Sequence, residues 1–172
     1  MADKSSAGLG PARSGMVLRV LESWWAPRRV VRGLSGMPDR VLLAVLMLAM
    51  LITFIGQAPV HVRAAQMDPS IPLDARMGGA AMGSIFMMPL LAYAMAGLVS
   101  LISRVTPWPI DARESRIALF WALLAVTPAV LLAGLVVGLI GPSPVLTLTR
   151  TVAGLGFLII WGAGLSALAK RT

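Results

Sequence analysis

Four long stretches of the chain are apolar and contain no Asp, Glu, Lys or Arg. They span residues 41–60, 77–102, 117–140 and 151–169. Because an α-helix rises about 1.5 Å per residue, roughly 20 apolar residues are enough to cross the hydrocarbon core of a bilayer. None of the stretches alternates apolar and polar residues as a membrane-barrel strand does, and the Leu, Ala and Met that fill them favour helices. The pattern predicts an all-α polytopic membrane protein with four transmembrane helices.

A shorter pattern precedes the first predicted span, in residues 16–38. Its apolar side chains recur at the spacing of one helical face, opposite a polar face. That apolar face consists of Val17, Leu18, Leu21 and Trp25. Pro27 breaks or restarts the helix, because proline is accepted in a first turn but not in a helix interior. We therefore expect an N-terminal amphipathic interfacial helix in two parts.

These patterns divide the chain into three parts. Residues 1–15 are polar and contain no apolar run, so we expect them to be disordered and not to be a cleaved signal peptide. Residues 16–38 are the cytoplasmic amphipathic segment. Residues 39–172 are the four-helix transmembrane domain.

The composition excludes a soluble domain and most kinds of catalysis. Of the 172 residues, 58% are apolar and 13% are charged, whereas soluble domains have about 45–50% and 25%. The chain has no cysteine and one histidine, which excludes disulfides, thiolate metal sites and cysteine nucleophiles. It also lacks the short motifs of serine hydrolases, zinc proteases and phosphate-binding loops. We expect a protein that is not an enzyme and has no cofactor or metal.

The basic residues predict the orientation. In a four-helix arrangement, twelve of the fifteen lie on one side and three, Arg63, Arg76 and Arg150, lie on the other. Loops rich in Lys and Arg stay in the cytoplasm, so we expect both termini to be cytoplasmic. Thirteen of the fifteen are arginine, and with the abundant Ala and Gly this is typical of a GC-rich bacterial genome. The expected location is a bacterial inner membrane.

The candidate contact residues cluster beside the first predicted span. They are Trp24, Trp25, Arg28, Arg29 and Arg32. Tryptophan and arginine suit a water–lipid boundary, because the indole is amphipathic and the guanidinium extends to the water. We expect these residues to contact lipid or a protein partner, although anchoring by positive charge alone also explains the arginines. The net charge of +8 then favours anionic lipid, not nucleic acid, as the partner.

Two glycine pairs have the spacing of a helix-packing motif. Gly79 and Gly83 lie in the second predicted span, and Gly134 and Gly138 lie in the third. Small residues in such rows let two helix backbones approach closely. We expect these four glycines to pack helices together, within one chain or between two copies.

Two further local signals concern the interior and the start of predicted spans. Pro89 and Pro128 lie inside the second and third spans and predict kinks. Asp111, followed three residues later by Glu114, predicts a capping box ahead of the third span. None of the four charge-free stretches holds an ionisable group that would mark a proton or ion path.

Three segments resemble the Yip1 family in its small bacterial form. They are the basic segment WWAPRRVVRGL, the loop DPSIPLDARMGG before the second span and RESRIALFWALLAVTP at the start of the third. The resemblance covers roughly residues 20–169. It implies a polytopic membrane protein similar to adaptors in membrane traffic, and it assigns no functional residue in this chain.

These observations favour a non-enzymatic membrane protein that organises or scaffolds membrane components. Its expected partners are membrane lipids and other integral membrane proteins, with no nucleic acid. An accessory subunit of a larger bioenergetic or transport complex also needs no chemistry of its own. A small channel for uncharged solutes is the third hypothesis.

Overall fold

The computed structural model describes residues 15–169 and contains no strand among them. Four of its segments are helices long and apolar enough to cross a membrane, which confirms the all-α, four-span fold. The spans are Asp39–Met67, Leu73–Ser103, Ala112–Leu139 and Pro144–Leu168. Residues 1–14, which we expected to be disordered, lie outside the described residues.

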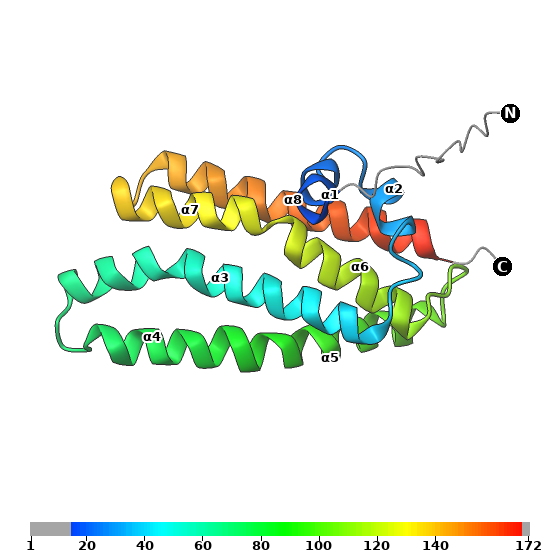
Figure 1. Ribbon diagram of the computed structural model, residues 1–172, viewed down its shortest axis with the longest axis horizontal. Helices are drawn as coiled ribbons and strands as arrows, with labels where there is room; N and C mark the ends of the chain where they lie inside the picture. The colour runs from blue at the N-terminus through cyan, green and yellow to red at the C-terminus, as the bar shows by residue number, and fades with distance from the viewer. Residues whose placement is uncertain (1–14, 170–172) are drawn as a thin grey trace, which may run out of the picture.

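The spans are antiparallel neighbours joined by short loops (Figure 1). The first is the single helix α3 (Asp39–Met67), and the fourth is α8 (Pro144–Leu168). The first and fourth are longer than their charge-free stretches, because charged side chains such as Arg63 and Arg150 lie on outer helical turns. Such side chains extend toward water while their backbone stays helical.

The second and third spans are each interrupted where the sequence places a proline. The second consists of α4 (Leu73–Ala81), a π-helix η1 (Met82–Met87) and α5 (Met88–Ser103). The third consists of α6 (Ala112–Ala125) and α7 (Thr127–Leu139), with Val126 between them. Proline removes one backbone donor and crowds the carbonyl four residues before it. The π-helix that ends two residues before Pro89 and the break at Pro128 are the responses of the helix to that crowding.

The third span is the centre of the bundle. Within its most apolar window 56% is buried, compared with 22–33% in the other three spans. Phe120 and Trp121 on α6 are almost fully buried and belong to the same apolar cluster as Leu46 of α3 and Ile160 of α8. The start of α6 carries the predicted capping box of Asp111 and Glu114, so this local prediction is confirmed.

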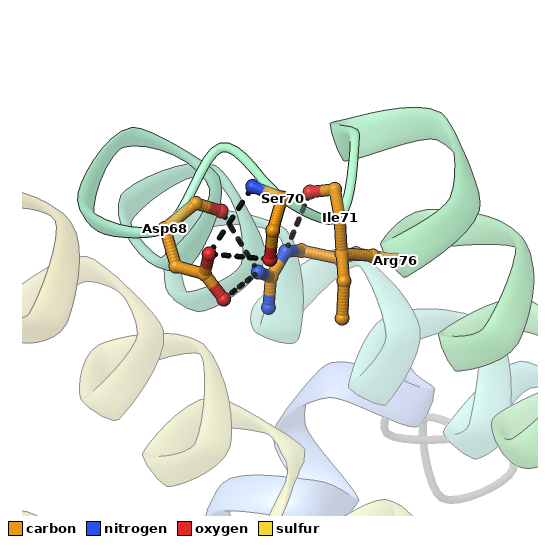
Figure 2. Close-up of polar contacts among 4 residues, drawn as sticks. All are labelled: Asp68, Ser70, Ile71 and Arg76. Carbon is orange, nitrogen blue, oxygen red and sulfur yellow. Dashed lines mark hydrogen bonds and ion pairs between the residues drawn. The ribbon is translucent and has the colours of Figure 1, made fainter.

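A group of polar contacts stabilises the loop between α3 and α4 (Figure 2). Asp68 accepts hydrogen bonds from the backbone N–H and hydroxyl of Ser70, and its other oxygen lies 3.1 Å from Arg76 Nη2. Arg76 also donates to the carbonyl oxygens of Asp68 and Ile71, at 3.0 Å each. The bonds from Ser70 and the Arg76 charge lower the pKa of the Asp68 carboxyl. This loop is thereby held in one conformation.

We refer to one end of the bundle as the basic end. There α3 and α6 begin and α5 and α8 end (Figure 1). Asp39, at the start of α3, forms ion pairs with Arg113 and Arg116 of α6, at 3.6 and 3.9 Å. Arg116 also lies over the Tyr93 ring, with its guanidinium carbon 5.9 Å from the ring centre. These contacts join the first three spans at the basic end.

Candidate functional site

The segment before the first span forms two short helices that pack on the bundle. These are α1 (Met16–Glu22), which contacts α2 and α6, and α2 (Pro27–Arg32), which lies beside α8 (Figure 1). Pro27 begins α2, as the sequence predicted. The apolar side chains Val31 and Leu34 are almost fully buried, and Val31 contacts the Gly164 region of α8. Helix α2 therefore uses its apolar stripe to pack on the protein itself.

Helix α1 packs through a face that the helical pattern had assigned as polar. Val20 is buried and Ser23, directly after the helix, is fully buried. The apolar face predicted from the sequence points away from the bundle. Its members Val17, Leu18, Leu21 and Trp25 are all exposed. The outward face of this segment is thus available to lipid or to a partner, and its position at a membrane interface stays a prediction.

Trp24 fastens this segment to the break in the third span. Its indole Nε1–H donates to the carbonyl oxygen of Ala125 at 3.0 Å. In a regular α-helix the backbone N–H of Ala129 would donate to the Ala125 carbonyl oxygen, but here it donates to the Val126 carbonyl oxygen. The Ala125 carbonyl therefore accepts its hydrogen bond from outside the helix. The neighbouring Leu124 carbonyl, opposite the missing N–H of Pro128, accepts from the Thr127 hydroxyl. Both carbonyls at the break are therefore satisfied, as a low-dielectric setting requires.

A second indole forms the reciprocal attachment. Trp121 on α6 donates its Nε1–H to the Ser23 hydroxyl at 2.8 Å. That hydroxyl donates in turn to the carbonyl oxygen of Arg19 at 2.7 Å. One hydrogen bond thus runs from the N-terminal segment to the third span, and one runs back. No pattern in the sequence indicates the contact between Ser23 and Trp121, since the two residues lie 98 positions apart.

The attachment lies well along the spans and not only at their ends. Ala125 is about 20 Å from the start of the third span, whose 28 residues measure about 42 Å. The Trp24 ring also packs against Gly156, in the middle of α8, where a Cβ would lie 2.7 Å from the ring. Glycine at this position leaves the space for the indole. The N-terminal segment therefore lies beside the spans over about half of their length.

The other candidate contact residues face outward. Trp25 is 74% exposed, and the Arg29 side chain is 86% exposed with Glu22 at 3.9 Å. Arg28 and Arg32 are also exposed. Of the five candidates, Trp24 alone turns toward the protein interior. Trp25 and Arg29 form the outward surface of the segment.

The two glycine pairs lie in different surroundings. Gly134 faces Gly56, and a Cβ there would overlap the Gly56 carbonyl oxygen and lie 3.0 Å from the carbonyl carbon. A Cβ on Gly138 would lie 3.0 Å from Cβ of Pro59. This pair therefore packs α7 closely on α3. Within the described residues, a Cβ added at Gly79 or Gly83 meets no atom beyond its own stretch of helix within 4 Å, so neither glycine marks a close contact between two helices there.

The polar side chains of the N-terminal segment form hydrogen bonds that attach it to the third span. Within residues 15–169 no group of three or more His, Asp or Glu side chains is placed to hold a metal ion. Nearer the basic end, the hydroxyls of Ser100 and Ser115 donate to backbone carbonyls of Ile110 and Ala96. Such bonds position helices. The N-terminal segment, fastened on one side and exposed on the other, is the candidate functional site.

Comparison with protein-family models, with curated proteins and with solved structures found no match. The resemblance to the Yip1 family accordingly stays a prediction made from the sequence. The function proposed below is based on the geometry of the N-terminal segment and on the four spans.

Proposed function

We propose that this protein is a non-enzymatic scaffold or adaptor, integral to a membrane, that presents its N-terminal helices to another membrane component. The observation that carries the proposal is the double attachment of α1 and α2 through Trp24 and Trp121. A segment that served only as a positive anchor would need charge near the lipid headgroups. It would not need two indole hydrogen bonds to the third span.

The surface that this attachment holds in place combines apolar and basic groups. Trp25 offers an exposed indole, and Arg29 offers a guanidinium with one weak ion pair to Glu22. Tryptophan and arginine are the residues that most often dominate the binding energy of protein interfaces. A fixed surface also loses little conformational entropy when it binds. These properties fit an integral membrane partner with acidic residues beside its own spans.

The experiment is affinity purification of the full chain from native membranes after cross-linking. The test variant combines Trp25→Ala with Arg29→Ala, and the control is Arg150→Ala, an exposed arginine at the opposite end of the bundle. We expect wild type and Arg150→Ala to retain the same stoichiometric partner and the double variant to lose it. A wild-type protein that retains no stoichiometric partner contradicts the proposal, as does a partner that the double variant retains in full.

A second hypothesis, an accessory subunit of a larger membrane complex, is supported by the second span. Only 22% of its apolar window is buried in this chain. Gly79 and Gly83 leave its surface open, and small residues of this kind let another helix approach closely. Replacing Gly79 by leucine then releases the chain from the complex while the Trp25 and Arg29 variant stays bound. The scaffold hypothesis expects the reverse.

For orientation we propose that both termini lie in the cytoplasm of a bacterial cell, with the protein in the inner membrane. The support is the excess of arginine at one side of the four spans. Reporter fusions at positions 65 and 145 should then be periplasmic, and a fusion at position 110 should be cytoplasmic. A reversed result at any of the three contradicts this orientation.

A further inference from the structure

A pocket of about 970 Å³ lies at the basic end, between α2, the end of α5, the loop before α6 and the end of α8. Small-molecule sites usually occupy about 300–1,000 Å³, so this pocket is at the upper end of that range. Val99, Ile102 and Leu165 give it apolar walls, and Trp108, which is 58% exposed, lies at its edge.

Two arginines line the same pocket. Arg28 and Arg32 are four residues apart on α2, which places them on one side of that helix. Within the described residues neither guanidinium has an ion pair or a hydrogen bond, whereas Arg29, Arg113 and Arg116 each have a carboxylate within 4 Å. The pocket thus joins apolar walls to two positive charges that no carboxylate within residues 15–169 neutralises.

The position of the pocket along the spans matches the level of the lipid headgroups. Val99 is four residues before the end of α5, and Leu165 is three residues before the end of α8. The spans have 25 to 31 residues, or about 38–46 Å, so about 4–8 Å extends beyond each side of a 30 Å hydrocarbon core. The pocket therefore crosses the level at which acyl chains end and phosphates begin.

We propose that this pocket binds one anionic phospholipid. Arg28 and Arg32 hold the headgroup phosphate, since guanidinium groups bind phosphate oxygens through charged hydrogen bonds. The adjoining part of an acyl chain lies along Val99, Ile102 and Leu165. Basic pockets between membrane helices recognise anionic headgroups in this way. The site is separate from the outward surface of Trp25 and Arg29, so lipid binding can be tested independently of binding to the proposed partner.

The test uses the full chain in a neutral detergent, titrated with phosphatidylglycerol, phosphatidylcholine or inorganic phosphate. Bound molecules are counted by native mass spectrometry. We expect one phosphatidylglycerol to bind in preference to phosphatidylcholine. Arg28→Gln and Arg32→Gln should each weaken its binding at least about tenfold, because a hydrogen bond to a charged group contributes about 1.5–3 kcal/mol. Arg29→Gln makes the same change in charge on the same helix outside the pocket, and it should leave the affinity within about twofold.

A steric variant distinguishes binding inside the pocket from general attraction between the lipid and the charged surface. Gly162 lines the pocket, and an added Cβ there meets no atom within 4 Å, so Gly162→Leu fills pocket space without displacing the protein. We expect this variant to lose phosphatidylglycerol while it keeps both arginines and its helix content by circular dichroism. Equal binding of phosphatidylcholine, or equal weakening by Arg29→Gln, overturns the proposal. So does binding of inorganic phosphate that depends on Arg28 and Arg32 when phosphatidylglycerol does not bind.

Discussion

Replacing Gly134 by alanine adds one methyl group at the contact between the first and third spans. In a helix interior alanine is more favourable than glycine by about 1 kcal/mol. At this position, however, the added Cβ overlaps the backbone of Gly56, lying 3.0 Å from its carbonyl carbon. Backbone atoms cannot rotate away as the end of a side chain can, so α7 and α3 must separate.

The magnitude follows from two opposing terms. Adding a methyl group to a closely packed site costs roughly 1–3 kcal/mol, and here the obstacle is backbone, which favours the upper part of that range. After the gain of about 1 kcal/mol in helix propensity, we expect a net loss of about 1–2 kcal/mol. For a chain of this length 1 kcal/mol corresponds to about 2–4 °C in melting temperature. Gly134→Ala should therefore melt about 2–8 °C below wild type.

The assay is thermal unfolding in detergent, followed by circular dichroism. Gly79→Ala is the control in open space, because its Cβ meets nothing within 4 Å, and it should melt at or above the wild-type temperature. Gly56→Ala is the control at the same interface, since its Cβ lies at an ordinary 3.4–3.5 Å from Val130 and Leu131. If Gly134→Ala melts as high as wild type, α3 and α7 do not approach as described.

Two other predictions concern hydrogen bonds. Trp24→Phe keeps an aromatic ring but leaves the Ala125 carbonyl without its donor. Because a buried acceptor left unpaired costs about 1–3 kcal/mol, this variant should melt below wild type. The control variant Trp25→Phe changes an exposed residue and should melt at the wild-type temperature. A melting temperature of Trp24→Phe equal to that of wild type contradicts the hydrogen bond. The pKa of Asp68 is lowered in the folded protein, first by the bonds from Ser70 and then by Arg76. Its carboxylate therefore stabilises the loop at pH values above its ordinary pKa and loses this effect as the pH falls through the lower folded-state pKa. Limited proteolysis of the α3–α4 loop should find Asp68→Asn less protected than wild type at neutral pH, with the difference disappearing in acid; a difference that does not change with pH contradicts the assignment.

Local rules account for the features that the sequence predicted correctly. The four spans follow from charge-free length, since a long apolar run in lipid must satisfy its own backbone and becomes a helix. The interruptions near Pro89 and Pro128 and the capping box of Asp111 and Glu114 depend on atoms within about four residues. The ends of the spans were less well predicted, because residues such as Arg63 stay helical beyond the charge-free stretch.

The tertiary structure decided which faces and which glycines make contacts. Helix α1 packs through Val20 and through Ser23 and Trp24, which directly follow it, although the helical pattern had assigned its other face as the apolar one. Gly134 contacts a neighbouring helix and Gly79 does not, although each belongs to a glycine pair with the same four-residue spacing. In a bilayer, the side of a helix that faces lipid is as apolar as the side that faces another helix. Hydrophobicity therefore locates the spans, whereas contact between distant segments depends on their shape and on hydrogen bonds that form only when the bundle assembles.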